Sequence, residues 1–360
     1  MMHSRTARRH LLPLTWLLTI GLLAGCDGNR EPRVIFFIGD GVGVGYWTAA
    51  LFTADSLAIE AFPVLGLVDT RADPQIVTDS AAAATALACG VRTYNGAIGV
   101  DAEERELTSV LEVAEARGAA TGLVATSSLT HATPAAFAAH VARRSMENEI
   151  AEQMAASGIE VLLGGGRRRF ARAPESGGTT LLDQLRATST CVTTAGEFRA
   201  LDLARTDRLV GLFANGHMPA AAEREPDLAE MTAAALAILD RDPDGFFLMV
   251  EGSQPDWRGH DNEPLAEMMA EMLDFDRAIR AGLAYRADHP GTLIIVTADH
   301  ETGGLAVEGA GEGGIRLDYT TGGHTAELVP LFAIGPGAER FAGLTSSDAI
   351  GRELLAIFRR

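Results

Sequence analysis

The feature that most constrains the fold is an alternation of short apolar runs with longer helical patterns. The apolar runs have the length and continuity of strands covered on both faces, and they are Val34–Ile38, Thr121–Thr126, Ile159–Leu163, Phe246–Val250, Thr292–Ala298 and Val329–Ile334. The segments with helical spacing between them are Ala81–Ala88, Leu107–Ala116, Pro134–Arg144, Leu228–Leu239 and Glu263–Tyr285. This order predicts an α/β fold with a mostly parallel central β-sheet and helices on both faces.

Residues 1–25 have the pattern of a signal peptide. An apolar stretch at residues 11–23 follows the basic residues Arg5, Arg8 and Arg9. It is shorter than a transmembrane helix needs to be. The Leu-Ala-Gly-Cys sequence that ends at Cys26 is similar to the lipobox of bacterial lipoproteins. We therefore expect cleavage before Cys26, a lipid on that cysteine, and a location in the periplasm or cell envelope. An ordinary signal peptide with a chance cysteine is the alternative.

The rest of the chain divides into a short tether and one long domain. Residues 26–33 are mostly polar and read as the tether, and residues 34–360 carry the whole alternation without an internal repeat. Contact with a membrane is expected only through the lipid anchor. Cys89 and Cys191 could form a disulfide, but two buried thiols are the favoured interpretation.

The net charge of the chain limits the kinds of partner that it is expected to bind. The 360 residues include 48 Asp and Glu against 30 Lys and Arg, which gives a formal net charge of −18. Nucleic-acid binders usually carry a basic excess, so we expect no binding to nucleic acid. All 30 basic residues are Arg, so no lysine amine is available as a nucleophile, and cationic contacts use guanidinium groups.

Polar side chains follow several of the predicted strands, at the edge where an α/β sheet binds its ligands. The acidic and imidazole groups are Asp40, Glu251, Asp256, His260, Asp299 and His300. Each one alone could be a helix cap or part of a turn. Four carboxylates at one edge would repel one another unless cations lay among them. Mixed Asp and His sets suit zinc and all-oxygen sets suit magnesium, so the pattern indicates a multi-metal hydrolase.

Ser80 is the candidate nucleophile, because it lies where a loop enters an Ala-rich helix. Together with Asp79 it could be a plain N-terminal cap. Alternatively, the helix N–H groups would stabilise negative charge near Ser80. No histidine or lysine base is close to it in sequence, but a zinc ion could lower the pKa of the hydroxyl directly.

The ordered motifs of the chain resemble those of the alkaline phosphatases, from about Arg33 to Phe341. The matching segments are VIFFIGDG from Val34, TDSAA from Thr78, TYNGA from Thr93, HATPAA from His131, LGGG from Leu163, FLMVEG from Phe247, TADHETGG from Thr297 and GHTAE from Gly323. The resemblance implies one catalytic domain of that fold over residues 34–360. It also implies hydrolysis of small phosphate monoesters through a phosphoserine, with two Zn²⁺ and one Mg²⁺.

The resemblance assigns a role to each matching residue. Ser80 would be the nucleophile, and Arg144, thirteen residues after His131, would bind phosphate, with the adjacent Arg143 as the alternative. The metal ligands would be Asp256, His260 and His324 for the first zinc, Asp40, Asp299 and His300 for the second, and Asp40, Thr133 and Glu251 for magnesium. Asp79, His131 and Trp257 would lie around the substrate and the ligands.

Two residues depart from the best-known bacterial members of the family. His131 stands where those enzymes carry Asp, although animal and some other bacterial members carry His, and Trp257 stands where they carry Lys. Both positions are near the magnesium and substrate sites. His300 and His324 are close in sequence, where many members insert a longer subdomain that contributes to the dimer, so a homodimer stays open.

Two other functions compete with a phosphomonoesterase. A phosphodiesterase or another hydrolase of the same superfamily would use overlapping metal ligands. A sulfatase would need a Cys or Ser in a C/S-x-P-x-R sequence, and the residues after Ser80 do not match it. A non-catalytic, phosphate-binding surface lipoprotein is the alternative from a different class.

Overall fold

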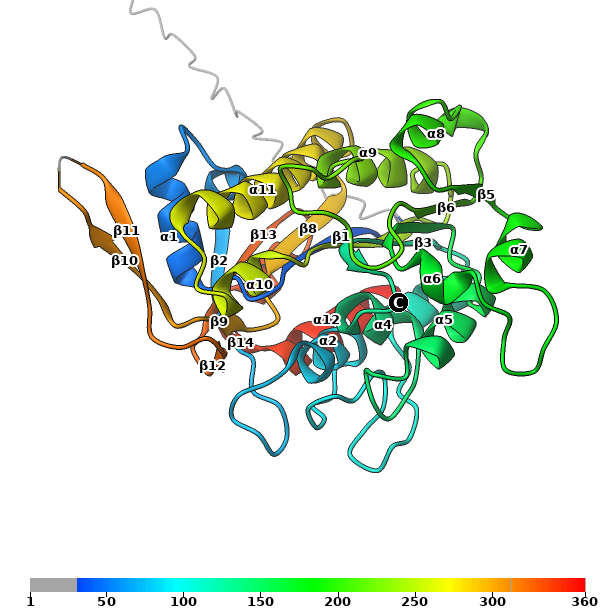
Figure 1. Ribbon diagram of the computed structural model, residues 1–360, viewed down its shortest axis with the longest axis horizontal. Coiled ribbons are helices and arrows are strands. Elements are labelled where there is room, and N and C mark those ends of the chain that lie inside the picture. Colours follow the sequence, from blue (N-terminus) through cyan, green and yellow to red (C-terminus); the bar gives the residue numbers. More distant parts are fainter. Residues whose placement is uncertain (1–30, 312, 360) are drawn as a thin grey trace, which may run out of the picture. The chain divides into compact units, whose positions relative to one another are not determined.

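A β-sheet with helices packed against it forms the centre of the described part of the chain (Figure 1). The computed structural model describes residues 31–311 and 313–359. Within those ranges ten strands join in the order β14 (Gly343–Ser346), β2 (Val64–Asp69), β13 (Val329–Ile334), β8 (Thr292–Thr297), β1 (Arg33–Gly39), β7 (Phe246–Gly252), β3 (Ala120–Ser128), β4 (Val161–Gly165), β6 (Leu209–Leu212) and β5 (Thr190–Val192). Among these strands only β13 is antiparallel to its neighbours. The prediction of a mostly parallel sheet is confirmed.

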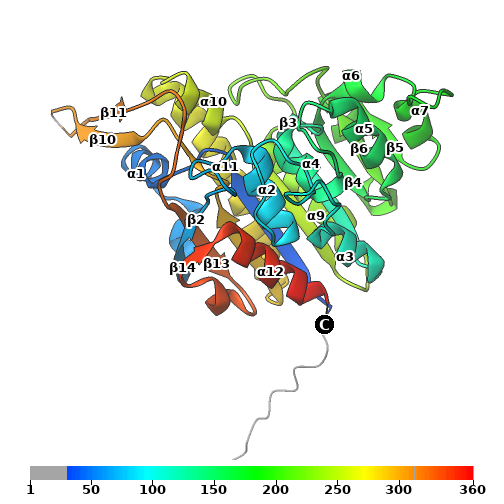
Figure 2. The ribbon, with the colours of Figure 1, turned by 90° about the horizontal axis from the view of Figure 1, so that it is seen from below.

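Helices cover both faces of the sheet, as predicted (Figures 1 and 2). One face carries α1 (Val44–Thr53), α9 (Leu228–Leu239) and α11 (Leu265–Asp288). The other face carries α2 (Ser80–Cys89), α3 (Val110–Ala116), α4 (Ala132–Ala138) and α12 (Ser347–Phe358). Strands β1, β7 and β8 are therefore buried on both sides, which explains their unbroken apolar sequences.

Shorter elements extend this core. The helical ones are α5 (Glu147–Ala156), α6 (Arg167–Phe170), α7 (Leu181–Arg186), α8 (Ala195–Arg199), α10 (Pro255–His260), η1 (Ala58–Ala61), η2 (Leu203–Arg205) and η3 (Ala338–Phe341). Two antiparallel pairs join β10 (Leu305–Gly309) to β11 (Ile315–Tyr319) and β9 (Glu301–Thr302) to β12 (His324–Thr325). The second pair brings the segment that follows β8 next to His324.

The predicted helix over residues 134–144 is wrong at both ends. Helix α4 spans Ala132–Ala138, and Ala139 is already extended. The chain leaves the helix because Val141 pairs with Ile98 in an isolated bridge, while His140 contacts Gly99 O and Glu112. Arg144 consequently lies on a loop rather than on a helix.

The helix predicted from Leu107 begins three residues later. Ser109 accepts a hydrogen bond from the Glu112 N–H, and the Glu112 carboxylate accepts one from the Ser109 N–H. This reciprocal cap sets the start of α3 at Val110.

The N-terminal predictions lie outside the described residues. They concern the signal peptide at 1–25, the lipid on Cys26 and most of the tether. In the described part of the chain, Cys89 and Cys191 are free thiols, the first buried and the second half-buried. Within the same part, the length and apolarity that a bilayer span needs are not combined in any helix.

Candidate active site

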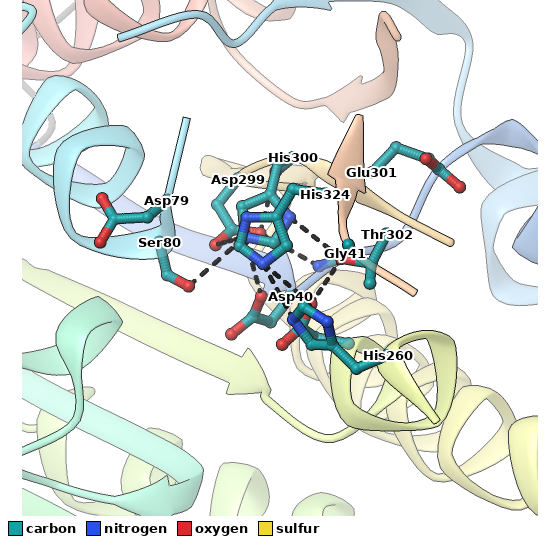
Figure 3. Close-up of polar contacts among 12 residues, drawn as sticks. Asp40, Gly41, Asp79, Ser80, His260, Asp299, His300, Glu301, Thr302 and His324 are labelled. Atoms are coloured by element: carbon teal, nitrogen blue, oxygen red, sulfur yellow. Dashed lines mark hydrogen bonds and ion pairs between the residues drawn. The ribbon is translucent and has the colours of Figure 1, made fainter. Parts of the chain in front are cut away.

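The carboxyl ends of the central strands bring predicted site residues together. Figure 3 shows Asp40, Ser80, His260, Asp299, His300 and His324 among them. The register pairs Gly39 at the end of β1 with Gly252 at the end of β7, and Ile38 with Thr297 at the end of β8. The residues that follow these strands therefore meet at one edge of the sheet.

Asp256, His260 and His324 form the first group of possible ligands. The two imidazole Nε2 atoms are 3.1 Å apart, and they lie 3.4 Å and 3.5 Å from Asp256 Oδ1. His260 Nδ1 donates to the Gly322 carbonyl at 2.8 Å, and His324 Nδ1 donates to the Thr78 carbonyl at 2.9 Å. Because a carbonyl only accepts, the proton of each neutral ring is on Nδ1. The two Nε2 lone pairs then face each other, which is unfavourable unless a cation lies between them.

Asp40, Asp299 and His300 form the second group, and all three are fully buried. His300 Nε2 lies 3.2 Å from Asp299 Oδ2 and 3.4 Å from Asp40 Oδ1. Gly41 has φ of +75°, and its N–H donates to Asp299 Oδ1 at 3.1 Å. A Cβ at Gly41 would lie 2.8 Å from Asp256 Cα, so the close approach of the two groups requires glycine there.

The third group contains Asp40, His131 and Glu251, whose ligand atoms lie within 4.8 Å of one another. Thr133, also predicted as a ligand, is fully buried on the first turn of α4. His131 was predicted as a neighbour of the magnesium rather than as a ligand.

Unpaired polar atoms in the second and third groups match a cation site. Buried oxygens without a hydrogen-bond partner in residues 31–311 and 313–359 include both of Asp40, Asp299 Oδ2, Glu251 Oε1 and Thr133 Oγ1. Burial, together with the charges of Asp299, Asp256 and Glu251, raises the pKa of Asp40 well above its ordinary value. Burial raises the pKa of Glu251 to about 7. Leaving such carboxylates ionised without a cation would be costly, so divalent metals fit the residues present.

Ser80 is the first residue of α2, and its side chain is directed toward the metal groups (Figure 3). Its Oγ lies 3.3 Å from His300 Nε2, a member of the second group of possible ligands, at the N-terminus of the helix. Asp79, one residue earlier, caps α2 by accepting from the Ala82 N–H at 3.0 Å. Asp79 is thus the cap, and Ser80 is left free to react.

Arg144, unlike the adjacent Arg143, has a side-chain contact with Asp79, the residue before Ser80. The Arg144 guanidinium donates to Asp79 Oδ2 at 3.1 Å, and its backbone N–H donates to the Gly96 carbonyl at 2.7 Å. The Arg143 side chain is exposed. The early end of α4 therefore distinguishes two arginines that the sequence left equivalent.

His217 is a residue of the site that sequence reasoning missed. Its ring lies edge-to-face against Trp257 and His131, with centroids 4.7 Å and 5.4 Å away. Its Nδ1 accepts a hydrogen bond from the Ser128 N–H at the end of β3. The Gly216 carbonyl accepts from the Gly166 N–H, which fixes the segment across the ends of β3 and β4. No motif marks His217, because this tertiary contact alone brings it to the site.

Thr302 was also missed. Its hydroxyl donates to Asp256 Oδ1, and its oxygen lies 3.2 Å from His300 Nδ1. Thr302 therefore connects a ligand of the first group to a ligand of the second and orients both.

Known proteins with the same organisation are alkaline phosphatases. The family model for alkaline phosphatase matches residues 32–315. Alkaline phosphatase 3 of Bacillus subtilis (strain 168) is 34% identical over 419 residues, covering 91% of this chain and 89% of that protein. The solved structure of alkaline phosphatase from the Antarctic bacterium TAB5 is similar with a TM-score of 0.84 and 36% identity, over 92% of this chain and 98% of that one.

A variant of the TAB5 enzyme, in which a histidine is replaced by aspartate, has Mg bound in its M3 site. Its TM-score is 0.83 at 36% identity, and the similarity covers 92% of this chain and 99% of that one. The matches in sequence and in structure extend over most of the chain. The chain therefore belongs to the alkaline phosphatase family of phosphomonoesterases.

Proposed function

We propose that the protein hydrolyses small phosphate monoesters through a phosphoserine at Ser80, with two Zn²⁺ and one Mg²⁺. The observation that carries the proposal is the position of Ser80 Oγ, 3.3 Å from His300 Nε2 at the start of a buried helix. The first zinc would be held by Asp256, His260 and His324, and the second by Asp40, Asp299 and His300. Magnesium would be held by Asp40, Thr133 and Glu251.

Metals would make this acidic edge able to bind a dianion. When bound, divalent ions would neutralise the carboxylates, acidify a coordinated hydroxyl or water and stabilise charge on phosphoryl oxygens. The carboxylates Asp40, Glu251, Asp256 and Asp299 carry four negative charges, and three divalent ions would carry six positive charges. Two positive charges would be left before Arg144 is counted, so the site attracts phosphate although the chain has a net charge of −18.

The residues of the chain supply attack and orientation. Ser80 Oγ, after losing its proton, attacks phosphorus, the bond from phosphorus to the leaving oxygen breaks, and the leaving alcohol takes up a proton. Water then loses a proton and attacks the phosphorus of the phosphoserine, the bond between phosphorus and Ser80 Oγ breaks, Ser80 Oγ takes up a proton, and inorganic phosphate leaves. Arg144, held by Asp79, would bind two phosphoryl oxygens in both steps. The N–H groups of the first turn of α2 favour the negative charge near Ser80.

Substrate preference separates this proposal from its alternatives. We expect release of phosphate from p-nitrophenyl phosphate, abolished by a chelator and restored by zinc with magnesium. Hydrolysis of bis(p-nitrophenyl) phosphate should be slower by several orders of magnitude, because the centre would bind a dianion. Faster cleavage of the diester would favour the phosphodiesterase, and binding of phosphate without turnover would favour the non-catalytic lipoprotein.

The two adjacent arginines provide a matched pair of variants. Arg144→Ala should raise KM and the inhibition constant of inorganic phosphate by about 10- to 100-fold, since a charge-assisted hydrogen bond contributes roughly 1.5–3 kcal/mol. Arg143→Ala should leave both constants within about twofold, because that side chain is exposed. Steady-state kinetics with phosphate as inhibitor measure both. The reverse order of effects would assign the phosphate contact to Arg143.

The stabilisation of the folded protein by bound metals should increase with pH. Glu251 and Asp40 have raised pKa values in the metal-free fold, about 7 for Glu251, so their stabilising contribution is lost as pH rises through those values. Metals hold the same groups ionised and must displace their protons at lower pH. Burial lowers the pKa of His131 to about 3, so this ring stays neutral with or without metal. Burial alone would lower the pKa of His300, but the charge of Asp299 and its hydrogen bond raise it, so a metal at His300 must also displace a proton at low pH.

We therefore expect the gap in Tm between metal-loaded and chelated protein to widen from pH 5.5 to 7.5. Differential scanning calorimetry at constant free zinc and magnesium measures this gap. The acid limb of the activity profile should also move to lower pH when zinc is added. A gap that does not depend on pH would contradict the assignment of Asp40 and Glu251 as ligands.

The location of the enzyme is a separate proposal. It rests on the lipobox-like sequence at Cys26, and we infer a membrane-anchored lipoprotein of the periplasm or cell envelope. The variant Cys26→Ser should block lipidation and move the protein from the detergent phase to the aqueous phase, or leave it unprocessed. Identical detergent partitioning of the wild type and of a processed Cys26→Ser form would reject the anchor.

Assembly as a homodimer is likewise a proposal. Leu65, Leu67 and Leu344 are exposed on the neighbouring strands β2 and β14, at one edge of the sheet, and a second copy could cover them. Light scattering of the purified protein would distinguish a dimer from a monomer.

A further inference from the structure

The neutral ring of His131 has one nitrogen lone pair, which either the Arg144 guanidinium or a cation could use. Its Nε2 lies 3.0 Å from Arg144 Nη2. A guanidinium has only donors, so Arg144 donates and His131 Nε2 accepts. The neutral ring therefore carries its proton on Nδ1, a buried atom without a hydrogen-bond partner in the part of the chain that the structure describes.

The same ring belongs to the third group of possible ligands, with Asp40 and Glu251. A cation could reach the ring at either nitrogen. At Nε2 it would take the lone pair that now accepts from Arg144. At Nδ1 it would force the proton onto Nε2, which would then face Arg144 as a second donor. With either nitrogen, ligation of a cation ends the hydrogen bond to Arg144.

Neighbouring side chains hold the ring of His131, so loss of the hydrogen bond between His131 and Arg144 would affect mainly the position of Arg144. Trp257 and His217 both stand edge-to-face to the ring, with centroids 6.3 Å and 5.4 Å away, and they restrict its plane. Arg144 has one other side-chain partner among the described residues, Asp79 beside Ser80. Loss of the contact with His131 would leave the guanidinium with one anchor instead of two.

We propose that His131 couples the third cation position to Arg144, because ligation of a cation by His131 and the Arg144–His131 hydrogen bond exclude each other. Magnesium prefers oxygen ligands and would leave the hydrogen bond in place. Zinc accepts imidazole nitrogen, so zinc at the third position would break it. His131 is then a positioning residue that makes phosphate binding depend on which metal is bound. The effect on phosphate rests on the proposed function, in which Arg144 binds phosphate.

The test compares the fully metallated enzyme with magnesium or with zinc at the third position. Anomalous scattering verifies the metal, and titration calorimetry measures the Kd of inorganic phosphate. We expect phosphate to bind roughly tenfold more weakly to the zinc form, within the usual range of coupling between two sites. By reciprocity, phosphate should weaken zinc at that position by the same factor. Equal phosphate affinity in the two forms would overturn the coupling.

A crystal structure of the zinc form tests the exclusion independently of phosphate affinity. We expect Arg144 Nη2 to lie beyond hydrogen-bond distance from His131, and an intact contact to a ligating His131 would refute the proposal. His131→Gln is the matched variant, since its amide oxygen has two lone pairs and can accept from Arg144 while it contacts a cation. It should bind phosphate equally well with either metal, and a persisting difference would mean that another residue carries the effect.

Arg144→Ala separates the coupling from the proposed function. It should weaken phosphate binding in the magnesium form and abolish the difference between the two metals. Unchanged phosphate affinity in the magnesium form would refute the role of Arg144 in the proposed function, while the contact in the zinc crystals would still decide the exclusion. A difference between metals that survives Arg144→Ala would overturn the coupling alone.

Discussion

Replacing Ser80 with alanine should lower phosphatase activity by at least about 10³-fold while the protein folds normally. The hydroxyl is the group proposed to form the bond to phosphorus, and it lies at the first position of α2. Alanine suits that position, and the Asp79 cap does not depend on the Ser80 side chain. A small activity from direct attack by water is allowed. Initial rates with p-nitrophenyl phosphate, together with Tm, measure the two effects.

Ser176→Ala is the control for the serine substitution. Ser176 is exposed in the loop between α6 and α7, so its loss should change neither activity nor Tm measurably. Full turnover in Ser80→Ala with normal metal content would remove Ser80 from the mechanism.

Asp40→Asn should lower phosphatase activity by a similar factor, through loss of bound metal rather than loss of the nucleophile. Asp40 belongs to the second and the third ligand groups, so its loss should weaken two metal positions together. Several kcal/mol of transition-state stabilisation would disappear, which corresponds to at least about 10³-fold in kcat/KM. Mass spectrometric metal counting should show less than full occupancy of both positions.

The same substitution should not destabilise the metal-free protein. The raised pKa of Asp40 means that its ionised form is unfavourable in the metal-free fold. The neutral amide should therefore keep or raise the Tm of the chelated protein, and lower only that of the metal-loaded protein. Asp55→Asn, an exposed carboxylate on the loop after α1, is the control and should change neither Tm nor metal content. Full metal occupancy in Asp40→Asn would show that Asp40 is not a ligand.

Sequence patterns predicted the middle of the sheet better than its edges. Strands β1, β7 and β8 are covered on both faces, and their unbroken apolar sequences were recognised. Strand β2 alternates between buried and exposed residues, and β14 is exposed over half its length, so neither contains a continuous apolar run. The end of α4 was missed because the bridge between Ile98 and Val141 joins segments far apart in sequence.

In the site too, residues that follow predicted strands could be foreseen, whereas residues that tertiary contacts bring together could not. Asp40, Asp299 and His300 directly follow strands that were predicted, so their meeting at one edge could be foreseen. The choice of Arg144 over Arg143 depends on where α4 ends and on the contact with Asp79. His217 reaches the site through the close approach of Gly216 to Gly166, and no local pattern contains that contact.

The central claim, that Ser80 carries the phosphoryl group during turnover, can be measured directly. Enzyme mixed with excess substrate and quenched in acid within one turnover should contain a phosphorylated peptide that includes Ser80, identified by fragmentation mass spectrometry. The label should be absent in Ser80→Ala and should disappear when substrate is exhausted. Active enzyme that releases phosphate without any phosphorylated residue, or with the phosphoryl group on another side chain, would contradict the mechanism.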